Sequence, residues 1–387
     1  MKSNRGKTMI FTRVRLANWR NFAHVEVALQ RRVFLVGPNA SGKSNFLDVF
    51  RFLHDLAAVG GGFQEAVVKR GGVSKLRCLA ARRRPEIEID VTVGGVAEEP
   101  EWRYELTFNQ DKGSRPKIEH ERVEKNGEEI VRRPDRSDKS DPERLRQTHL
   151  EQVNVNREFR ELTDFFALVR YLHLVPQLVR DRDRYMARGR DPFGSDFLEQ
   201  VARSPAKTRN ARLRRISNAL KVAVPQLQEL EFYRDATKGT PHLRARYEHW
   251  RPQGAWQTEQ EFSDGTLRLL GLLWAVLDGS GPLLLEEPEM SLHPEIVRVL
   301  PAMFARIQRK TGRQVLVSTH SSDLLYDTGI GLDEVILLNP AKEGTEVRLA
   351  KSISQAKALL QAGVPLADAV LPYASPPRPQ QLALFDV

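Results

Sequence analysis

The sequence GPNASGKS, at residues 37–44, decides the fold. It satisfies the pattern G-x-x-x-x-G-K-S, whose backbone N–H groups can cradle phosphates together with the positive end of the following helix dipole. The apolar strand RRVFLVG leads into it and the apolar-periodic segment NFLDVFRFLHDL follows it, which is the strand, loop and helix order that this chemistry requires. A chance glycine-rich turn is the alternative, and such a turn would not need these two neighbours.

The side chains of this stretch predict that the chain binds a nucleotide and magnesium. Lys43 would reach the β- and γ-phosphates, and the Ser44 hydroxyl would coordinate Mg²⁺. We therefore expect ATP and Mg²⁺ as cofactors. The residues expected to contact the nucleotide are Gly37, Pro38, Asn39, Ala40, Ser41, Gly42, Lys43, Ser44 and Asn45.

A second apolar strand, at residues 283–287, ends in two carboxylates with the sequence LLLEE. Open α/β sheets bind ligands at the carboxyl ends of their strands, so both acids are candidates for the site. Glu286 would organise Mg²⁺ through water, and Glu287 would orient or deprotonate the attacking water. The alternative is that the two acids only cap the helix that follows Pro288.

A third apolar strand, QVLV at residues 314–317, leads into Ser318, Thr319 and His320. If this strand neighbours the acidic strand, His320 lies near the γ-phosphate; the alternative is a histidine with a purely structural role. From residue 262 onward, helical patterns alternate with buried strands. This alternation predicts a parallel sheet that is covered on both faces.

The middle of the chain has a different pattern. Alternation with a period of two from residue 86 to residue 131, together with the hairpin signal Asn126-Gly127, predicts an antiparallel sheet. The polar, turn-rich stretch at residues 132–148 is expected to be an exposed, mobile loop.

Composition limits the classes of protein to which the chain can belong. Its 387 residues, 41% of them hydrophobic, suffice for a substantial core. The longest apolar run, Leu269–Leu277, has nine residues, which is about half of the roughly 20 that a membrane-spanning helix needs. No secretion signal is evident, and Cys78 is the only cysteine, so an internal disulfide is impossible. We therefore expect a cytoplasmic protein.

The formal net charge of +10 favours contact with a polyanion. Basic clusters lie at residues 82–84, 132–133, 180–190 and 207–215. Each of them is compatible with an ordinary solvated face. Together they leave a nucleic acid, DNA or RNA, open as a partner.

The segment FSDGTLRLL, at residues 262–270, selects among the classes of phosphate-loop protein. Locally it is an N-capped helix with Ser263 or Asp264 as the cap. The order of phosphate loop, FSDGTLRLL, LLLEEPEMSLHP and VSTH resembles the ABC-type ATPases of the SMC, RecF and OLD group, especially the stand-alone OLD-like ATPase heads of bacteria that lack a TOPRIM domain. This resemblance implies an α/β fold of the ABC-type P-loop ATPase head, with a mixed or parallel core sheet flanked by helices, an antiparallel β subdomain and a helical lobe.

The resemblance also implies a domain organisation. Residues 1–180 would form ATPase lobe I with the phosphate loop and the antiparallel β subdomain, and residues 181–260 a helical and β insert lobe. Residues 261–350 would carry the signature segment, the acidic strand and the switch histidine of the ATPase core. Residues 351–387 would form a C-terminal helix and a flexible tail.

Roles on both sides of a dimer follow from the resemblance. Ser263 and Gly265 are similar to the signature residues that contact the γ-phosphate bound by the opposite copy, in a head-to-tail homodimer around two ATP molecules. Residues 291–293 resemble the loop that communicates across that dimer. His320 resembles the switch histidine that senses the γ-phosphate.

Three more residues are assigned by their place in the motif order. Gln177, after the strand-like YLHLVP, would be the lid glutamine on Mg²⁺ and the attacking water. Arg20 and Asn21 match the place where relatives carry residues near the nucleotide, and a surface turn is the alternative there.

Departures from the group narrow the expected function. Glu286 stands where many relatives carry Asp, and the chain lacks the long coiled coil of SMC proteins. Only 67 residues follow His320, and they contain no D-x-D. OLD nucleases add a TOPRIM metal-binding domain after the switch histidine, so we expect no nuclease activity from this chain.

The C-terminal stretch QLALF resembles the peptide with which bacterial proteins dock on the DNA sliding clamp. Its anchor residues would be Gln381, Leu382, Leu384 and Phe385, placed after a proline-rich spacer. The alternative is a peptide that packs on its own domain or on a dedicated partner.

Our leading hypothesis is an ATP-hydrolysing switch that controls a separately encoded effector protein, DNA or both, in defence against phage. The main alternative is a RecF-like repair ATPase, which the clamp-like tail favours. From other classes, an ATPase subunit of a membrane transporter is disfavoured by FSDGT and EEPE, and a scaffold that binds ATP without hydrolysing it stays open.

Overall fold

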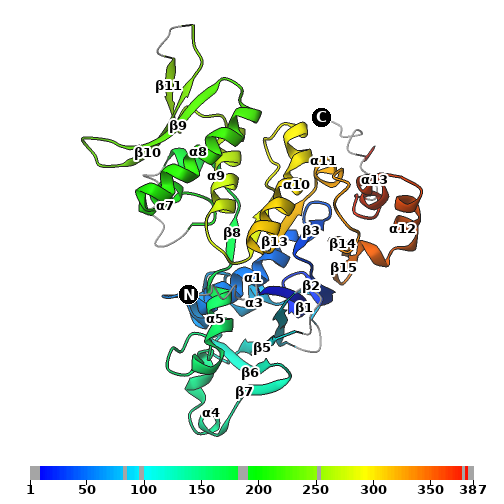
Figure 1. Ribbon diagram of the computed structural model, residues 1–387. Coiled ribbons are helices and arrows are strands. Elements are labelled where there is room, and N and C mark those ends of the chain that lie inside the picture. The colour runs from blue at the N-terminus through cyan, green and yellow to red at the C-terminus, as the bar shows by residue number, and fades with distance from the viewer. Residues whose placement is uncertain are drawn as a thin grey trace, which may run out of the picture. The chain divides into compact units, whose positions relative to one another are not determined.

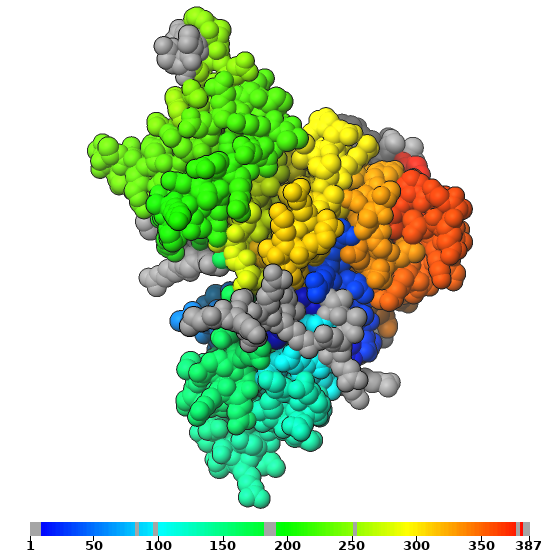
Figure 2. All heavy atoms as spheres, viewed as in Figure 1, coloured from blue at the N-terminus to red at the C-terminus, as the bar shows by residue number. Residues whose placement is uncertain are grey.

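The structure is a computed structural model that describes residues 9–81, 85–95, 100–181, 191–250, 254–376 and 380–381. The other residues are grey in Figures 1 and 2. The chain divides into two compact units. The first comprises Met1–Val169, Ser280–Leu284 and Pro301–Val387, and the second comprises Arg170–Gly279 and Leu285–Leu300.

The core sheet of the first unit is built from the strands β3 (Arg32–Val36), β12 (Leu283–Glu286), β13 (Val315–Thr319), β14 (Val335–Ala341) and β15 (Gly344–Leu349). Their order is β15-β14-β3-β13-β12, and β12 continues into the second unit. β3 runs parallel to β13 and β14, whereas β15 is antiparallel to β14. Every residue of β3 and β13 is buried, as a parallel sheet covered on both faces requires.

The second sheet of the first unit is antiparallel. It consists of β1 (Ile10–Trp19), β2 (Phe22–Ala28), β4 (Ile87–Gly94), β5 (Trp102–Gln110), β6 (Pro116–Lys125) and β7 (Glu128–Arg133). The order is β2-β1-β4-β5-β6-β7, so the predicted antiparallel sheet is confirmed. Asn126 and Gly127 both have positive φ, at 51° and 83°, as the predicted two-residue hairpin turn requires.

Helices cover these sheets and complete the core of the first unit (Figure 1). They are α1 (Lys43–Ala57), α2 (Phe63–Val68), α3 (Val73–Leu76), α4 (Arg136–Ser140), η1 (Pro142–Arg146), η2 (Asn156–Phe159), α5 (Arg160–Ala167), α11 (Ser322–Leu325), η4 (Ala350–Ser352), α12 (Ser354–Gln361), α13 (Leu366–Val370) and η5 (Leu371–Tyr373). Aromatic rings join β1 to α1 and α5, because the ring of Phe11 lies 4.6 Å from that of Phe50 and 4.9 Å from that of Phe165. α10 (Pro294–Thr311) begins in the second unit and ends in the first.

The second unit combines helices with a small sheet. Its elements are β8 (Arg170–Leu172), α6 (Pro176–Arg180), α7 (Phe197–Arg203), α8 (Ala206–Ala223), β9 (Leu227–Arg234), β10 (Pro241–Tyr247), β11 (Ala255–Thr258) and α9 (Asp264–Leu277). The order of the antiparallel sheet is β11-β10-β9, and α8 packs along β9 (Figure 1). In the described part of the chain, no helix combines the length and the apolarity that crossing a membrane requires.

The stretch at residues 132–148 corrects a sequence-based expectation. We expected an exposed, mobile loop, but the structure has the short helices α4 and η1 there, and Arg133, Asp138 and Leu145 are buried. The polar composition led to the wrong expectation because charged side chains within the stretch, such as Arg133 and Asp138, pair with each other and are buried.

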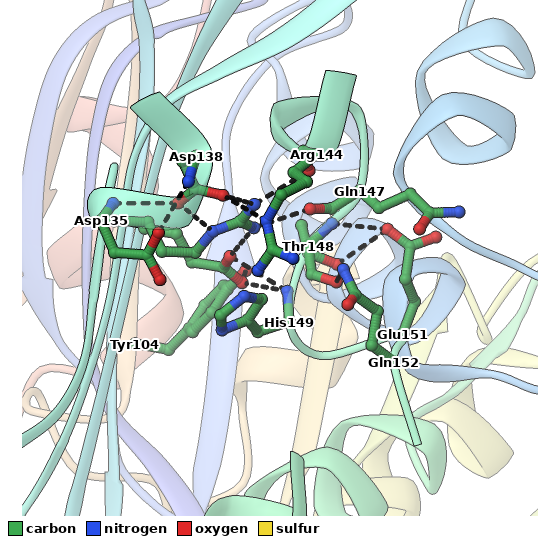
Figure 3. A network of polar contacts seen from close by, with 11 residues as sticks. Tyr104, Asp135, Asp138, Arg144, Gln147, Thr148, His149, Glu151 and Gln152 are labelled. Atoms are coloured by element: carbon green, nitrogen blue, oxygen red, sulfur yellow. Dashed lines mark hydrogen bonds and ion pairs between the residues drawn. The ribbon is translucent and has the colours of Figure 1, made fainter. Parts of the chain in front are cut away.

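Arg133 anchors this stretch, and Figure 3 shows the surrounding network. Its guanidinium donates two hydrogen bonds of 2.9 Å to the carboxylate of Asp138 and one of 2.9 Å to Glu121. Two backbone carbonyls, those of Arg144 and Gln147, accept the others at 2.9 and 2.7 Å. Each donor group of the side chain thus has a partner although Arg133 is only 1% exposed.

The other side of the network closes around Glu121, which is fully buried. Its carboxylate also accepts hydrogen bonds from the Tyr104 hydroxyl at 3.1 Å and from the His149 backbone N–H at 3.0 Å. Burial and the neighbouring Arg133 lower the pKa of His149 to about 4, so its ring is neutral at neutral pH. The network therefore ties β5, β6 and the end of β7 to the segment that follows α4.

Replacing Arg133→Ala should lower the free energy of unfolding by about 3–5 kcal/mol, because it leaves buried Glu121 without a cation and Asp138 with only the half-exposed Arg144. Denaturant titration followed by circular dichroism measures the effect. Arg132→Ala is the matched control, since the side chain of Arg132 is 69% exposed, and it should change stability by less than about 0.5 kcal/mol. Equal losses in the two variants would contradict the anchoring role.

Candidate functional site

The phosphate loop of the first unit lies between β3 and α1. Its geometry depends on two glycines: a Cβ on Gly37 would lie 2.4 Å from the Leu338 carbonyl oxygen, and Gly42 has a φ of 96° with Asn21 packed against it. Ala40 also adopts a positive φ, at 60°. The loop therefore holds a backbone conformation that few other sequences tolerate, directly before the first turn of a 15-residue helix.

Lys43 is the first residue of α1 and is almost fully buried. Its ammonium group donates hydrogen bonds to the carbonyl oxygens of Gly37, at 2.8 Å, and Pro38, at 3.0 Å. The side chain thus reaches back over the loop to the side where the loop N–H groups would hold phosphates. Ser44 follows as the second residue of α1.

Asn21 fixes the loop from the turn between β1 and β2. Its amide donates to the Ser41 carbonyl at 3.1 Å and to the Thr345 hydroxyl at 2.6 Å, and its oxygen accepts from Asn45 at 2.7 Å. The structure therefore places Asn21 in contact with the phosphate loop. Sequence reasoning missed Thr345, whose hydroxyl also donates to the Ser41 carbonyl.

Arg20 lies beside the loop rather than on it. It pairs with Asp48 at 3.0 Å. Burial would raise the pKa of that carboxyl, but Arg70 and Arg20 hold it below its usual value. A hollow of about 650 Å³ opens next to these residues and is lined, among others, by Arg20, Asn21, Asn45, Lys75, Lys342 and Glu343.

His320 follows β13, which pairs with β3 so that Thr319 stands opposite Val36. The segment that carries His320 therefore leaves the sheet beside the start of the phosphate loop. β13 also neighbours β12, since the Leu283 N–H donates to the Gln314 carbonyl at 2.9 Å. His320 was expected near the γ-phosphate if its strand lies beside the acidic strand, and β13 and β12 are indeed neighbours.

The acidic residues at the end of β12 belong to the second unit. The Tyr171 hydroxyl, from β8, donates a hydrogen bond to the Glu286 carboxylate, and the imidazole of His173 lies 3.3 Å from the Glu286 carbonyl oxygen. Glu287 has a φ of 44°, a conformation that costs a non-glycine residue about 1–3 kcal/mol and that clusters at functional sites. No local sequence signal marks Tyr171 as a neighbour of Glu286.

The signature segment begins α9 in the same unit. Ser263 is the N-cap, and its hydroxyl accepts the Thr266 N–H at 3.2 Å. A Cβ on Gly265 would lie 2.5 Å from the Ser291 carbonyl oxygen, so glycine is needed where the signature meets the loop at residues 291–293. Ser291 itself has a φ of 62°.

Two more polar residues surround the start of α9. The amide of Gln177, in α6, lies 3.5 Å from the Asp264 carboxylate, and Arg180 pairs with that carboxylate at 2.7 Å. Arg268, one turn into α9, is half buried, and its pKa is lowered by burial against the opposing effects of Asp264 and Glu287. Gln177 thus stands beside the signature segment. Arg268, which sequence reasoning missed, interacts electrostatically with Glu287, the candidate base.

The structure brings the predicted residues together in two sets. Arg20, Asn21, the phosphate loop and His320 share the first unit, whereas Gln177, Ser263, Gly265, Glu286 and Glu287 share the second. Among the described residues, no cluster of three or more His, Cys, Asp or Glu side chains could hold a metal by itself. The Ser44 hydroxyl and the Glu286 carboxylate are oxygen donors of the kind that Mg²⁺ prefers, and Mg²⁺ commonly binds through one or two protein oxygens plus substrate phosphates.

Part of the sequence-based predictions lies outside the described residues. This holds for the basic clusters at residues 82–84 and 182–190 and for Leu382, Leu384 and Phe385 of the clamp-like tail. Gln381 is described and exposed.

Comparison with known proteins identifies relatives of this fold. The family model described as "AAA domain, putative AbiEii toxin, Type IV TA system" matches residues 32–327. No curated protein matches the chain. Two similar solved structures are Smc heads, one from Pyrococcus furiosus with an extended coiled coil and bound to the C-terminal domain of ScpA, the other bound to the C-winged helix domain of ScpA.

The similarity to these heads is one of fold. The first has a TM-score of 0.53 at 10% identity and covers 92% of this chain and 99% of that chain. The second has a TM-score of 0.51 at 12% identity, with coverages of 87% and 96%. The expected α/β fold of a P-loop ATPase head is thereby confirmed.

Replacing Tyr171→Phe removes the hydroxyl that holds Glu286. If Glu286 organises Mg²⁺, the Mg²⁺ concentration for half-maximal ATP turnover should rise roughly tenfold, since hydrogen bonds to charged groups contribute about 1.5–3 kcal/mol. Tyr373→Phe, which removes an exposed hydroxyl bonded to Gln355, is the control and should leave the requirement unchanged. An unaltered Mg²⁺ requirement in the Tyr171 variant would refute this positioning role.

Proposed function

The chain belongs to the family described as AAA domain, putative AbiEii toxin, Type IV TA system, and we propose that it works as an ATP-driven switch in the cytoplasm. Family and fold together support an ATPase of the SMC and AAA type. In the proposed cycle, two copies close head-to-tail around two ATP molecules and hydrolysis reopens them. The observation that carries the proposal is the phosphate loop, with buried Lys43 reaching back over it between β3 and α1.

Each residue of the site would have a defined task. The loop N–H groups and Lys43 would bind the β- and γ-phosphates, Glu287 would orient or deprotonate the attacking water, and His320 would contact the γ-phosphate. Ser44 and Glu286, with Gln177 as the lid residue, would hold Mg²⁺. The metal would supply charge neutralisation on the phosphate oxygens.

The start of α9 supports the dimeric arrangement. The N-terminus of this 14-residue helix is a site where backbone N–H groups attract an anion. The Asp264 carboxylate would repel a phosphate there, but Arg180 neutralises it at 2.7 Å. Ser263 and Gly265 could therefore receive the γ-phosphate held by the opposite copy.

A separately encoded effector protein is the proposed target of the switch. The Smc heads that share the fold are bound to domains of ScpA, which shows that this fold can carry a protein partner. The family description as a putative toxin of a TA system supports a role in phage defence. DNA is a second proposed partner, because the chain is basic.

Replacing Glu287→Gln should leave ATP binding intact, lower turnover by about 10²–10⁴-fold through loss of the base and accumulate closed dimers. Lys43→Ala should instead weaken ATP binding. Equilibrium binding of a fluorescent ATP analogue, phosphate release and light scattering after size exclusion measure the three effects. Glu295→Gln, on an exposed side chain, is the control; turnover in Glu287→Gln equal to wild type would remove Glu287 as the base.

Mixing two inactive variants tests the shared site. In a head-to-tail dimer, a Lys43→Ala copy and a Ser263→Arg copy form one damaged and one intact site, so the mixture should recover turnover that neither variant has alone. Phosphate release by the separate and mixed proteins is the measurement. Failure to recover any turnover, while both variants remain folded by circular dichroism, would count against the head-to-tail arrangement.

A further inference from the structure

α8 of the second unit has an unusual charge pattern. Its 18 residues, AKTRNARLRRISNALKVA, contain two lysines and four arginines and neither Asp nor Glu. One side of the helix is apolar and buried through Leu213, Ile216 and Leu220. Packing of the helix requires the apolar side. It does not explain why the opposite side carries no acidic residue.

Two of the six cations take part in the internal structure of the unit. Arg212 pairs with Asp278 at 2.8 Å and lies over the Trp274 ring. Arg209 stacks on Phe232, with 4.0 Å from its guanidinium carbon to the ring centroid. These two residues help to fix α8 against α9 and β9.

The remaining four cations point outward. Lys207, Arg214, Arg215 and Lys221 are exposed, and none forms an ion pair with any described residue. Lys207, Arg214 and Lys221 follow one another at intervals of seven residues, so they lie close to one line along the helix. At 1.5 Å of rise per residue they are about 10.5 Å apart and span about 21 Å.

Hollows flank this line on both sides of the helix. One of about 370 Å³ lies between α8 and β9 and is lined among others by Asn210, Arg214, Ser217, Asn218, Lys221 and Gln228. A second of about 320 Å³ is lined among others by Lys207, Thr208 and Arg215. Amide and hydroxyl groups therefore accompany the cations in the first hollow, and the Thr208 hydroxyl does so in the second.

The acids near this surface are already engaged. Glu229 and Glu231 also line the first hollow, but they pair with Arg246 and Arg244 of the neighbouring strand β10. They leave the positive charge of α8 uncompensated.

We propose that the exposed ridge of α8, formed by Lys207, Arg214, Arg215 and Lys221, binds the sugar-phosphate backbone of a nucleic acid. The inference deepens the proposed function by naming the surface for its nucleic-acid partner, and it rests on that function only for the coupling to ATP. Evenly spaced cations suit a polymer with a regular charge spacing. Amide and hydroxyl side chains beside them are the groups that add hydrogen bonds to phosphate and sugar.

The test uses the full chain and a short fluorescent DNA duplex, with anisotropy measured at several salt concentrations. The triple variant Arg214→Ala, Arg215→Ala, Lys221→Ala should weaken binding roughly tenfold or more at low salt and flatten the log–log salt dependence by roughly 0.9 for each lost phosphate contact. The control triple variant Arg132→Ala, Arg136→Ala, Lys139→Ala removes the same charge from exposed positions of the first unit. It should bind DNA nearly as wild type does.

The inference would be overturned if the α8 variant bound DNA with wild-type affinity or if the control variant lost as much affinity. It would also be overturned if a polyglutamate peptide bound the ridge as tightly as DNA, because that result would indicate an acidic protein partner. ATP turnover without DNA and thermal unfolding are measured on the same samples and should match wild type in both variants. If the Lys43→Ala variant loses ATP turnover but still binds DNA, DNA binding by the α8 ridge does not depend on ATP hydrolysis, and the two proposals are tested independently. Absent turnover in wild type alongside α8-dependent DNA binding would defeat the proposed function and leave the ridge in place.

Discussion

Parallel pairing between β3 and β13 is the interaction on which the functional part of the first unit depends. Both strands are buried along their whole length, and the register sets Thr319 opposite Val36. Because the strands run in the same direction, the phosphate loop and the segment with His320 leave the sheet at the same edge. Asn21 and Thr345 then hold the Ser41 carbonyl from two other elements. The loop is therefore shaped by the sheet rather than by its own composition alone.

The local signals of this fold could be predicted from the sequence. GPNASGKS, the apolar strands and the Asn126-Gly127 turn each depend on neighbours within a few residues, so pattern and propensity suffice to place them. Tyr171 could not be predicted in the same way, because its hydroxyl meets Glu286 across 115 positions of sequence. Arg133 was missed for a related reason: a polar stretch predicts exposure unless the buried partners of its charges are known. In both cases the pairing of polar side chains was missed, whether the partners lie 115 positions apart, as for Tyr171 and Glu286, or only 5 apart, as for Arg133 and Asp138.

In the second unit, backbone strain occurs at residues to which the resemblance to ABC-type ATPases assigns functional roles. Glu287 and Ser291 both have positive φ without being glycine. Gly265 approaches the Ser291 carbonyl so closely that no side chain fits. A backbone in such conformations persists only when its surroundings determine it, and here the N-cap of α9 and the contact between Tyr171 and Glu286 do so. The two strained residues lie within five positions of each other, and the groups that support them come from β8 and from the start of α9 in the same unit.

The distribution of charge says more about the partner than the net value of +10. In the first unit, the buried guanidinium groups of Arg70 and Arg133 are matched by carboxylates, those of Asp48 and Asp55 for Arg70 and those of Glu121 and Asp138 for Arg133. α8 has no such match for most of its cations, and its arginines at 209, 212 and 215 are spaced three residues apart. Like charges at that spacing destabilise an isolated helix by about 0.2–0.5 kcal/mol per pair. Contacts with Trp274, Phe232 and Asp278 offset this repulsion for Arg209 and Arg212. The exposed cations of α8 have no acidic partner among the described residues, so an anion from outside the chain would supply their counter-charge.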